Sequence, residues 1–170
     1  MTEEDRSAYE KRFGREEEMN IQFTLNGLPT KAEIDADTLL LDLVRSKGCY
    51  SVKRGCETAN CGLCTVWVDE KPVLSCSTLA ARVDGHSVIT LEMLQQEAEE
   101  FGRFLAREGA EQCGFCSPGF IMNVLAMEKE LVDPSEEEIK EYLAGNLCRC
   151  TGYMGQLRAV KKYLSRKAGR

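Results

Sequence analysis

The sequence is poor in several residue types on which common protein functions depend. Its single histidine, His86, excludes both a Cys₂His₂ zinc finger and a three-histidine catalytic metal site. Lysine and arginine total 22 against 28 aspartates and glutamates, and the net charge of -6 disfavours a nucleic-acid partner, which binds a basic face. No apolar run reaches the roughly 18 residues that a membrane span needs, so no span is expected.

The N-terminal segment also lacks the apolar stretch of a secretory signal. Residues 1–19 are strongly charged, and we interpret them as an arm outside the folded domains. We therefore expect a cytoplasmic protein. In contrast to these shortages, the chain has nine cysteines, an odd number that disfavours a framework of disulfides. In a reducing compartment, clustered cysteines more often bind metal or take part in redox chemistry.

The first half of the sequence has the pattern of a small sheet with one helix. Apolar alternation on both sides of Asn26-Gly27 predicts a β-hairpin, and residues 65–76 predict a second hairpin that turns at Asp69-Glu70. Residues 37–47 have helical spacing, with Asp37 or Thr38 as the expected N-cap. This combination predicts a β-grasp-like domain over residues 20–93.

The second half has helical periodicity and clear helix start signals. Ser135 and Glu138 form a predicted capping box, and Pro118 suits the first turn of a helix. The four predicted helices cover residues 92–110, 118–131, 135–145 and 151–167. We therefore predict an α+β protein in which an all-helical domain at residues 94–170 follows the sheet domain.

Four cysteines of the first half have the spacing of plant-type ferredoxins. Three lie in one loop in the order Cys56-x₄-Cys61-x₂-Cys64, and Cys76 follows the second hairpin. This spacing is a signature of a [2Fe–2S] cluster held by four thiolates. A zinc site is the alternative, but four-cysteine zinc sites commonly use two short pairs, and this half has only one.

The second half supplies another four cysteines in two short pairs, Cys113-x₂-Cys116 and Cys148-x-Cys150. Residues two apart in extended backbone point to the same face, so Cys148 and Cys150 can reach one site. Both pairs precede predicted helices, whose N-termini favour an anionic group. On spacing alone, an iron–sulfur cluster, a zinc site and a thioredoxin-type Cys-x-x-Cys motif remain open.

Three long stretches carry a family resemblance: SVKRGCETANCGLCTVWVDEKPVLSC, EQCGFCSPGFIMN and AGNLCRCTGY. With them, residues 20–163 resemble the small iron–sulfur subunit of the xanthine dehydrogenase (molybdenum hydroxylase) family. The resemblance implies a plant-type ferredoxin-like β-grasp domain followed by a four-helix-bundle domain, each with one [2Fe–2S] cluster. It implies Cys56, Cys61, Cys64 and Cys76 as ligands of the first cluster, and Cys113, Cys116, Cys148 and Cys150 as ligands of the second.

The resemblance also implies a function and partners. Such a chain is the electron-transfer subunit of a molybdenum-dependent oxidoreductase and has no substrate-activating site of its own. It relays electrons from a molybdopterin centre in a large subunit to FAD in a medium subunit, within a heterotrimer or a dimer of heterotrimers. The helical-domain cluster then lies next to the pterin, close to Gln112 and Cys150, and the plant-type cluster lies toward the flavin.

Two kinds of alternative remain for the function. Within the same family, the complex can be an aldehyde, nicotinate or carbon monoxide dehydrogenase instead of a xanthine or purine dehydrogenase. Outside it, a free ferredoxin-like carrier is disfavoured, because a simple carrier needs only the first set of four cysteines. A zinc-stabilised interaction module without a redox role is the other alternative, and a visible spectrum distinguishes it because zinc is colourless.

Four further residues have more ordinary interpretations. Ala59 stands where the family often has glycine, so we expect either a negative φ there or a slightly different loop. Cys49 is expected to be a packed residue outside both ligand sets. Trp67 is expected to pack or to contact a partner, and His86 to be solvated.

Overall fold

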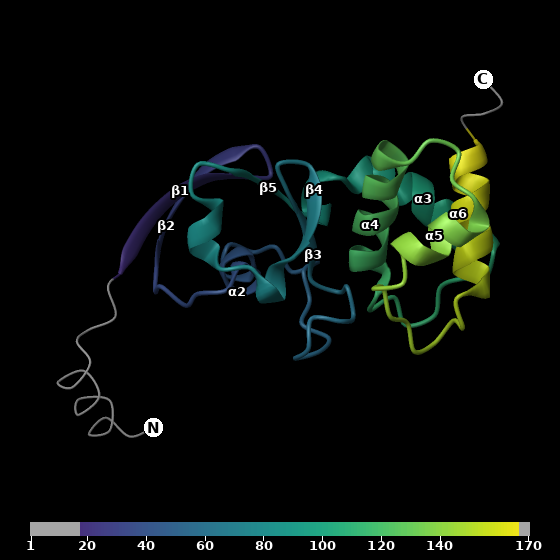
Figure 1. Ribbon diagram of the computed structural model, residues 1–170, viewed down its shortest axis with the longest axis horizontal. Helices are drawn as coiled ribbons and strands as arrows, with labels where there is room; N and C mark the ends of the chain where they lie inside the picture. The colour runs from purple at the N-terminus through teal and green to yellow at the C-terminus, as the bar shows by residue number, and fades with distance from the viewer. Residues whose placement is uncertain (1–17, 167–170) are drawn as a thin grey trace.

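The computed structural model describes residues 18–166, which form two halves of different secondary structure (Figure 1). A five-stranded sheet and the short helix α2 make up the first half, and helices α3 to α6 make up the second. The fold is therefore α+β, as predicted. The arm predicted at residues 1–19 lies almost entirely outside the described residues. Among the helices of this described region, none is long and apolar enough to cross a membrane.

The sheet has the strand order β2-β1-β5-β3-β4. Two antiparallel hairpins, β1–β2 and β3–β4, meet on the central strand β5, which runs parallel to β1 and antiparallel to β3. The strands are β1 (Met19–Leu25), β2 (Leu28–Ile34), β3 (Thr65–Val68), β4 (Lys71–Leu74) and β5 (Ser87–Ile89).

Both predicted hairpins are confirmed, and they turn at the predicted residue pairs. Asn26 and Gly27 have φ values of 50° and 80°, and Asp69 and Glu70 have φ values of 47° and 66°. Two consecutive positive φ angles are what a type I′ turn requires, and this turn matches the twist of the strands that it joins.

The expected cap of the first helix is wrong. Helix α2 (Leu40–Ser46) has no side-chain cap, so neither Asp37 nor Thr38 fills that role. The Thr38 hydroxyl instead accepts a hydrogen bond from the backbone N–H of Asp35. The first N–H of the helix donates to the carbonyl of Thr78 at 2.8 Å. A distant segment therefore supplies the acceptor that a local cap usually provides.

The second half contains the four predicted helices, with shorter bounds. They are α3 (Gln95–Arg107), α4 (Ser117–Glu130), α5 (Glu136–Tyr142) and α6 (Met154–Ser165). The Ser135–Glu138 capping box and the place of Pro118 in the first turn of α4 are both confirmed. Within residues 18–166, three 3₁₀ turns complete the secondary structure, at Ser75–Ser77, Ala80–Val83 and Leu91–Met93.

Two helices begin later than predicted for local reasons. Residues Leu91–Met93 form a 3₁₀ turn, so α3 starts only at Gln95. Tyr153 has a φ of 69°, which a right-handed helix cannot continue, so α6 starts at Met154.

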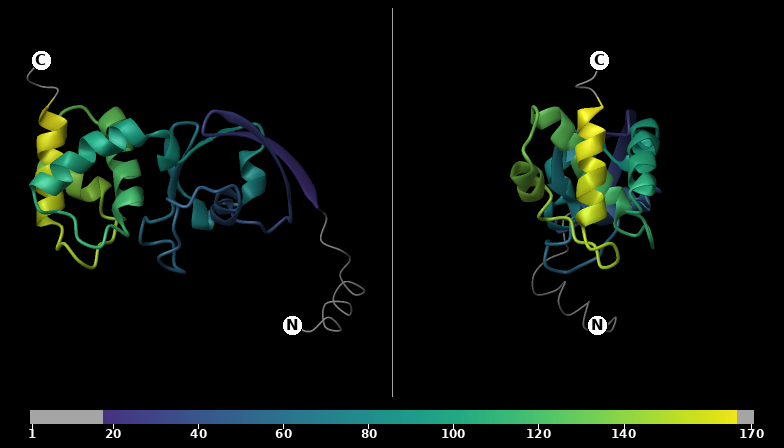
Figure 2. Two further views of the ribbon diagram at one scale, coloured as in Figure 1. Left: turned by 180° about the vertical axis from the view of Figure 1, so that it is seen from behind. Right: turned by 90° about the vertical axis from the view of Figure 1, so that its right-hand side faces the viewer.

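The two halves have separate apolar cores that meet at β3 and α4. One core lies between the sheet and α2, and the other lies among α3 to α6 and includes the buried ring of Trp67. The indole N–H of Trp67 donates to the carbonyl of Met122 at 3.0 Å, which confirms packing as its role. The left view of Figure 2 shows α6 at the end of the helical half that is farthest from the sheet.

Candidate metal centres

The first cysteine site is formed by the loop between α2 and β3 together with the residue that follows β4. Cys61 and Cys64 are buried, with 6% and 2% of their surface exposed, while Cys56 and Cys76 are half-buried. The thiols approach one another in two pairs, Cys56 with Cys61 and Cys64 with Cys76. The structure therefore brings together all four residues that the sequence predicted for this site.

Backbone N–H groups of this loop point at the sulfurs. Those of Thr58 and Asn60 donate to Cys56 and lower the pKa of its thiol to about 6. Cys61 also accepts from a backbone N–H, but its burial dominates and raises its pKa. Burial, together with the neighbouring Cys64 thiol, likewise raises the pKa of Cys76. Donors aimed at sulfur stabilise negative charge there, which is the environment that an anionic cluster needs.

Close approach within the loop depends on small residues. A Cβ on Gly55 would lie 2.7 Å from Leu63 Cδ2 and 3.2 Å from the Cys61 sulfur. Ala59 has a φ of 54°, so the expected alternative of a negative φ is wrong. The loop keeps a left-handed residue at this position even with a methyl side chain, at a modest cost in strain.

The second cysteine site joins two segments that are distant in sequence. The sulfurs of Cys113 and Cys150 lie 3.5 Å apart, and Cys116 pairs with Cys148. Cys113 and Cys150 are exposed, in contrast to the buried cysteines of the first site. Cys116 is the N-cap residue of α4, so this helix does begin at the site as predicted. All four predicted residues are again brought together.

The turn that precedes α6 supports Cys148 in a way that the sequence did not reveal. The Thr151 hydroxyl lies 3.1 Å from the Cys148 sulfur, and the Thr151 N–H donates to the same sulfur at 3.4 Å. The Tyr153 hydroxyl accepts from the N–H of Cys148 at 3.0 Å. Burial opposes ionisation of Cys148, but the bonds from Thr151, together with those from the Cys150 backbone and the Cys116 thiol, outweigh it and lower its pKa. This turn separates Cys150 from the start of α6, where the sequence predicted direct succession.

Gln112 lies at the exposed edge of the second site. Its side-chain amide donates to the carbonyl of Cys150 at 3.1 Å. This bond crosses between the two segments of the site and holds Gln112 beside the exposed sulfurs of Cys113 and Cys150. Gln112 is therefore placed to meet a group that approaches these sulfurs from outside.

The two cysteine loops touch one another along the same edge of the molecule (Figure 1). The N–H of Leu147 donates to the carbonyl of Cys61 at 2.9 Å. Beside this contact, Asn146 is 7% exposed, and its side-chain carbonyl accepts from the amide of Asn123 at 3.0 Å. The same Asn123 amide also donates to Thr65 at 3.2 Å, so it ties the start of β3 to the second site.

Two glycines make this contact possible. A Cβ on Gly119 in α4 would lie 2.2 Å from the carbonyl oxygen of Gly62, and a Cβ on Gly62 would lie 2.5 Å from the carbonyl oxygen of Gly145. Any side chain at either position therefore requires the two halves to shift. The two sites therefore meet at a closely packed junction.

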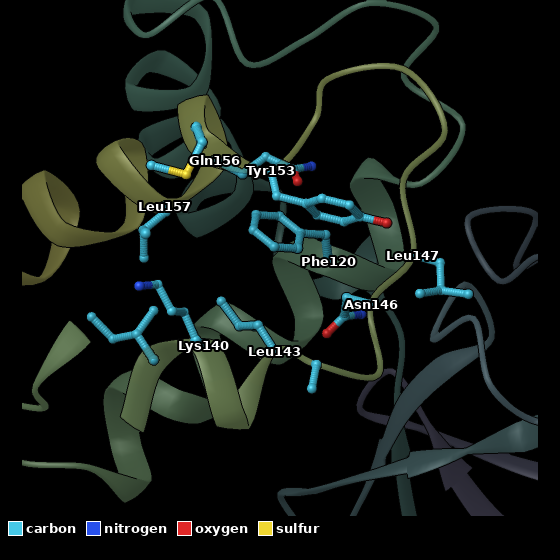
Figure 3. A pocket seen from close by; sticks show the side chains of 11 residues that line it. Phe120, Lys140, Leu143, Asn146, Leu147, Tyr153, Gln156 and Leu157 are labelled. Atoms are coloured by element: carbon cyan, nitrogen blue, oxygen red, sulfur yellow. The ribbon is translucent and has the colours of Figure 1, made fainter. Parts of the chain in front are cut away.

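An apolar pocket of about 360 Å³ lies between α4, α5 and α6, next to the second site. Figure 3 shows Phe120, Leu143 and Leu157 bordering it, with Asn146 close to Leu147 at one end. Tyr153, whose hydroxyl supports Cys148, also lines this pocket.

Cys49 and His86 lie outside both sites. Cys49 is buried and accepts a weak hydrogen bond from the Asn26 amide at 3.6 Å, and burial raises its pKa. Its predicted packing role is confirmed. His86 is half-exposed as predicted, and its Nδ1 also lies 2.5 Å from a carboxylate oxygen of Asp69.

The donor sets fit binuclear iron–sulfur clusters. Within residues 18–166, no group of three or more His, Cys, Asp or Glu side chains is placed to hold a single metal ion. Each site instead presents two pairs of thiols, and a [2Fe–2S] cluster takes one pair of protein ligands on each iron. The backbone donors to sulfur suit the same group.

Comparison with known proteins agrees with this chemistry. Residues 23–91 match the family described as 2Fe-2S iron-sulfur cluster binding domain, and residues 90–161 match the [2Fe-2S] binding domain family. The xanthine dehydrogenase iron-sulfur-binding subunit of Escherichia coli O157:H7 is 43% identical over 144 residues, covering 81% of this chain and 89% of that protein. The nicotinate dehydrogenase small FeS subunit of Eubacterium barkeri is 38% identical, covering 88% of this chain and 98% of that subunit.

A solved structure shows the same fold. A chain of quinoline 2-oxidoreductase from Pseudomonas putida 86 superposes with a TM-score of 0.80 at 36% sequence identity, covering 90% of this chain and 97% of that chain. Together with the two sets of four cysteines, these similarities show that the chain belongs to the iron–sulfur subunits of the xanthine dehydrogenase and molybdenum hydroxylase family.

Proposed function

We propose that this chain relays electrons between a molybdopterin-binding large subunit and an FAD-binding medium subunit of an oxidoreductase complex. The observation that carries the proposal is the direct contact between the two cysteine sites, where the N–H of Leu147 donates to the carbonyl of Cys61. When bound, two [2Fe–2S] clusters would supply one-electron carriers at these sites. The chain's part is to hold them at a fixed separation and to present each to a different partner.

The ligand sets follow from the thiol pairs. In the first site, Cys56 and Cys61 would hold one iron, and Cys64 and Cys76 the other. In the second site, the corresponding pairs are Cys113 with Cys150 and Cys116 with Cys148.

The division of the chain at residues 20–93 and 94–170 belongs to the same proposal. Two separate apolar cores and two family matches that meet near residue 90 support it. We propose the first unit as a plant-type ferredoxin-like β-grasp domain and the second as a four-helix-bundle domain.

The second site is the one that would face the molybdenum subunit. Its outer thiols are exposed, and apolar side chains that a partner could cover surround them: Phe115, Leu147, Tyr153 and Met154 are 45–59% exposed. The resemblance places Gln112 and Cys150 beside the pterin and the loop of Cys56 toward the flavin. A heterotrimer, or a dimer of heterotrimers, satisfies both contacts. The nine free thiols fit a reducing compartment such as the cytoplasm.

The substrate of the complex is proposed to be a purine or another N-heterocycle. Xanthine, nicotinate and quinoline appear in the names of three similar proteins. An aldehyde dehydrogenase or a carbon monoxide dehydrogenase is the competing assignment, and the large subunit decides between them.

The test uses the native complex, with its subunits identified by mass spectrometry. Anaerobic mixing with the substrate should bleach the visible absorbance of the clusters. Gln112→Ala should slow this bleaching while iron content stays at the wild-type level, because the Gln112 amide donates to the Cys150 carbonyl and Gln112 is not one of the proposed ligands. A free carrier would instead purify without large subunits. A structure of the complex with residues 56–64 nearer the pterin than Cys150 would reverse the proposed order.

A further inference from the structure

Lys53 is a residue of the first half that acts on the second cysteine site. It precedes the loop of the first site, and its backbone N–H donates to the carbonyl of Leu63 at 3.2 Å. Lys53 is therefore anchored at the stem of the first cysteine loop, and its side chain is half-buried.

The side chain of Lys53 crosses to the second site. Its ammonium donates to the carbonyl oxygen of Phe115 at 3.2 Å and lies 4.7 Å from the centroid of the Phe115 ring. Phe115 stands between Cys113 and Cys116, so the Lys53 ammonium lies against the loop that carries both thiols. Among the described residues, no carboxylate forms an ion pair with Lys53, whereas its neighbour Arg54 pairs with Asp42.

The contact reaches the backbone of a predicted cluster ligand through one peptide group. The carbonyl of Phe115 and the N–H of Cys116 belong to the same peptide unit. A cation on the carbonyl polarises the peptide and strengthens the donor at its other end. The preceding N–H, that of Phe115, donates to the Cys113 sulfur. Hydrogen bonds to sulfur and local charge set the reduction potential of an iron–sulfur cluster.

We propose that Lys53 is a positioning residue that raises the reduction potential of the second, helical-domain cluster relative to the first. This inference rests on the proposed function. Reduction adds one negative charge to a cluster, and a cation held against the loop of that cluster stabilises the reduced form. Lys53 thereby links the two halves electrostatically as well as by packing.

The experiment is an EPR-monitored redox titration of the complete complex. Lys53→Met should shift the midpoint potential of the helical-domain cluster to more negative values and shift that of the first cluster less, with unchanged iron content. Lys53→Arg keeps the charge and should stay close to wild type. If Lys53→Met loses a cluster, Lys53→Gln, which keeps a donor but not the charge, replaces it in the comparison with Lys53→Arg.

Lys129→Met is the matched control. Lys129 also bridges the halves, with its ammonium 4.5 Å from the Trp67 ring centroid, but its ion pair is with Glu70 of the β3–β4 turn and not with a cysteine loop. Its removal should leave both potentials unchanged. Wild-type potentials in Lys53→Met, or an equal shift in Lys129→Met, would overturn the inference. Failure of the proposed function would differ, because the wild-type chain would then purify without a large molybdopterin subunit, while its two clusters could still be titrated.

Discussion

The two cysteine sites hold the same number of thiols but differ in how they are built. The first takes three of its cysteines from one loop and buries Cys61 and Cys64 within the folded half. The second joins segments 37 residues apart and leaves Cys113 and Cys150 exposed. The first is thus covered for the most part by the chain itself, whereas the second leaves its outer thiols open. This difference fits the proposed relay, in which a partner subunit covers the outer thiols of the second site.

The largest expected effect comes from removing one ligand of each site. Cys61→Ser should abolish the EPR signal of the first cluster and spare the second, because the two ligand sets share no residue. Cys148→Ser should do the reverse. Low-temperature EPR of the dithionite-reduced complexes measures both outcomes.

Cys49→Ser is the control for these two variants. Cys49 is buried in the core of the first half and belongs to neither set, so both signals should remain. Loss of either signal in this variant would show that the ligand assignment is incorrect.

The junction between the sites should be sensitive to a single methyl group. Gly119→Ala places a Cβ 2.2 Å from the Gly62 carbonyl, which is backbone and cannot move aside cheaply. Overpacking of this kind costs about 1–3 kcal/mol. Gly102→Ala in α3 is the matched control, since no atom lies within 4 Å and the helix gains about 1 kcal/mol in propensity. Urea unfolding should therefore show opposite signs for the two alanines.

A somewhat smaller loss of stability is expected when the buried side-chain amide of Asn146 is removed. Asn146→Ala removes the acceptor of the Asn123 amide and should cost about 1–2 kcal/mol in unfolding free energy. Asn60→Ala, at an exposed side chain that bonds only to Thr58, should stay within about 0.5 kcal/mol of wild type. Equal costs for the two variants would mean that the Asn146 contact does not join the sites.

The smallest effect concerns pH. Burial opposes ionisation of Glu92, but hydrogen bonds from Thr90 and Ser51 outweigh it and hold its pKa below the usual value. A depressed carboxyl pKa stabilises the fold above the unfolded value of about 4.3, and this contribution is lost as pH falls through the lower folded pKa. Glu92→Gln should therefore flatten the loss of stability as pH falls below about 5 and through the folded pKa, by less than about 1 kcal/mol because the group is only partly buried. An unchanged slope would contradict this assignment.

Structural features that depend on residues adjacent in sequence can be predicted from the sequence, whereas features that depend on distant segments cannot. The turns at Asn26-Gly27 and Asp69-Glu70 and the Ser135 cap follow from adjacent residues, and they were predicted correctly. The start of α2 was not, because its acceptor comes from Thr78.

The sites follow the same rule. Spacing identified which cysteines gather, since the motif lies in the sequence. Other features depend on residues that only the fold brings together. They are the pairing of thiols across segments, the hydrogen bonds of Thr151 and Tyr153 to Cys148, and the contact of Lys53 with Phe115.

The presence of two [2Fe–2S] clusters is tested by the metal and acid-labile sulfide content of the purified complex, measured together with EPR. We expect two irons and two labile sulfides for each of the two matched cluster-binding regions, and two distinguishable signals after reduction. Stoichiometric zinc without labile sulfide, in a colourless protein, would contradict it.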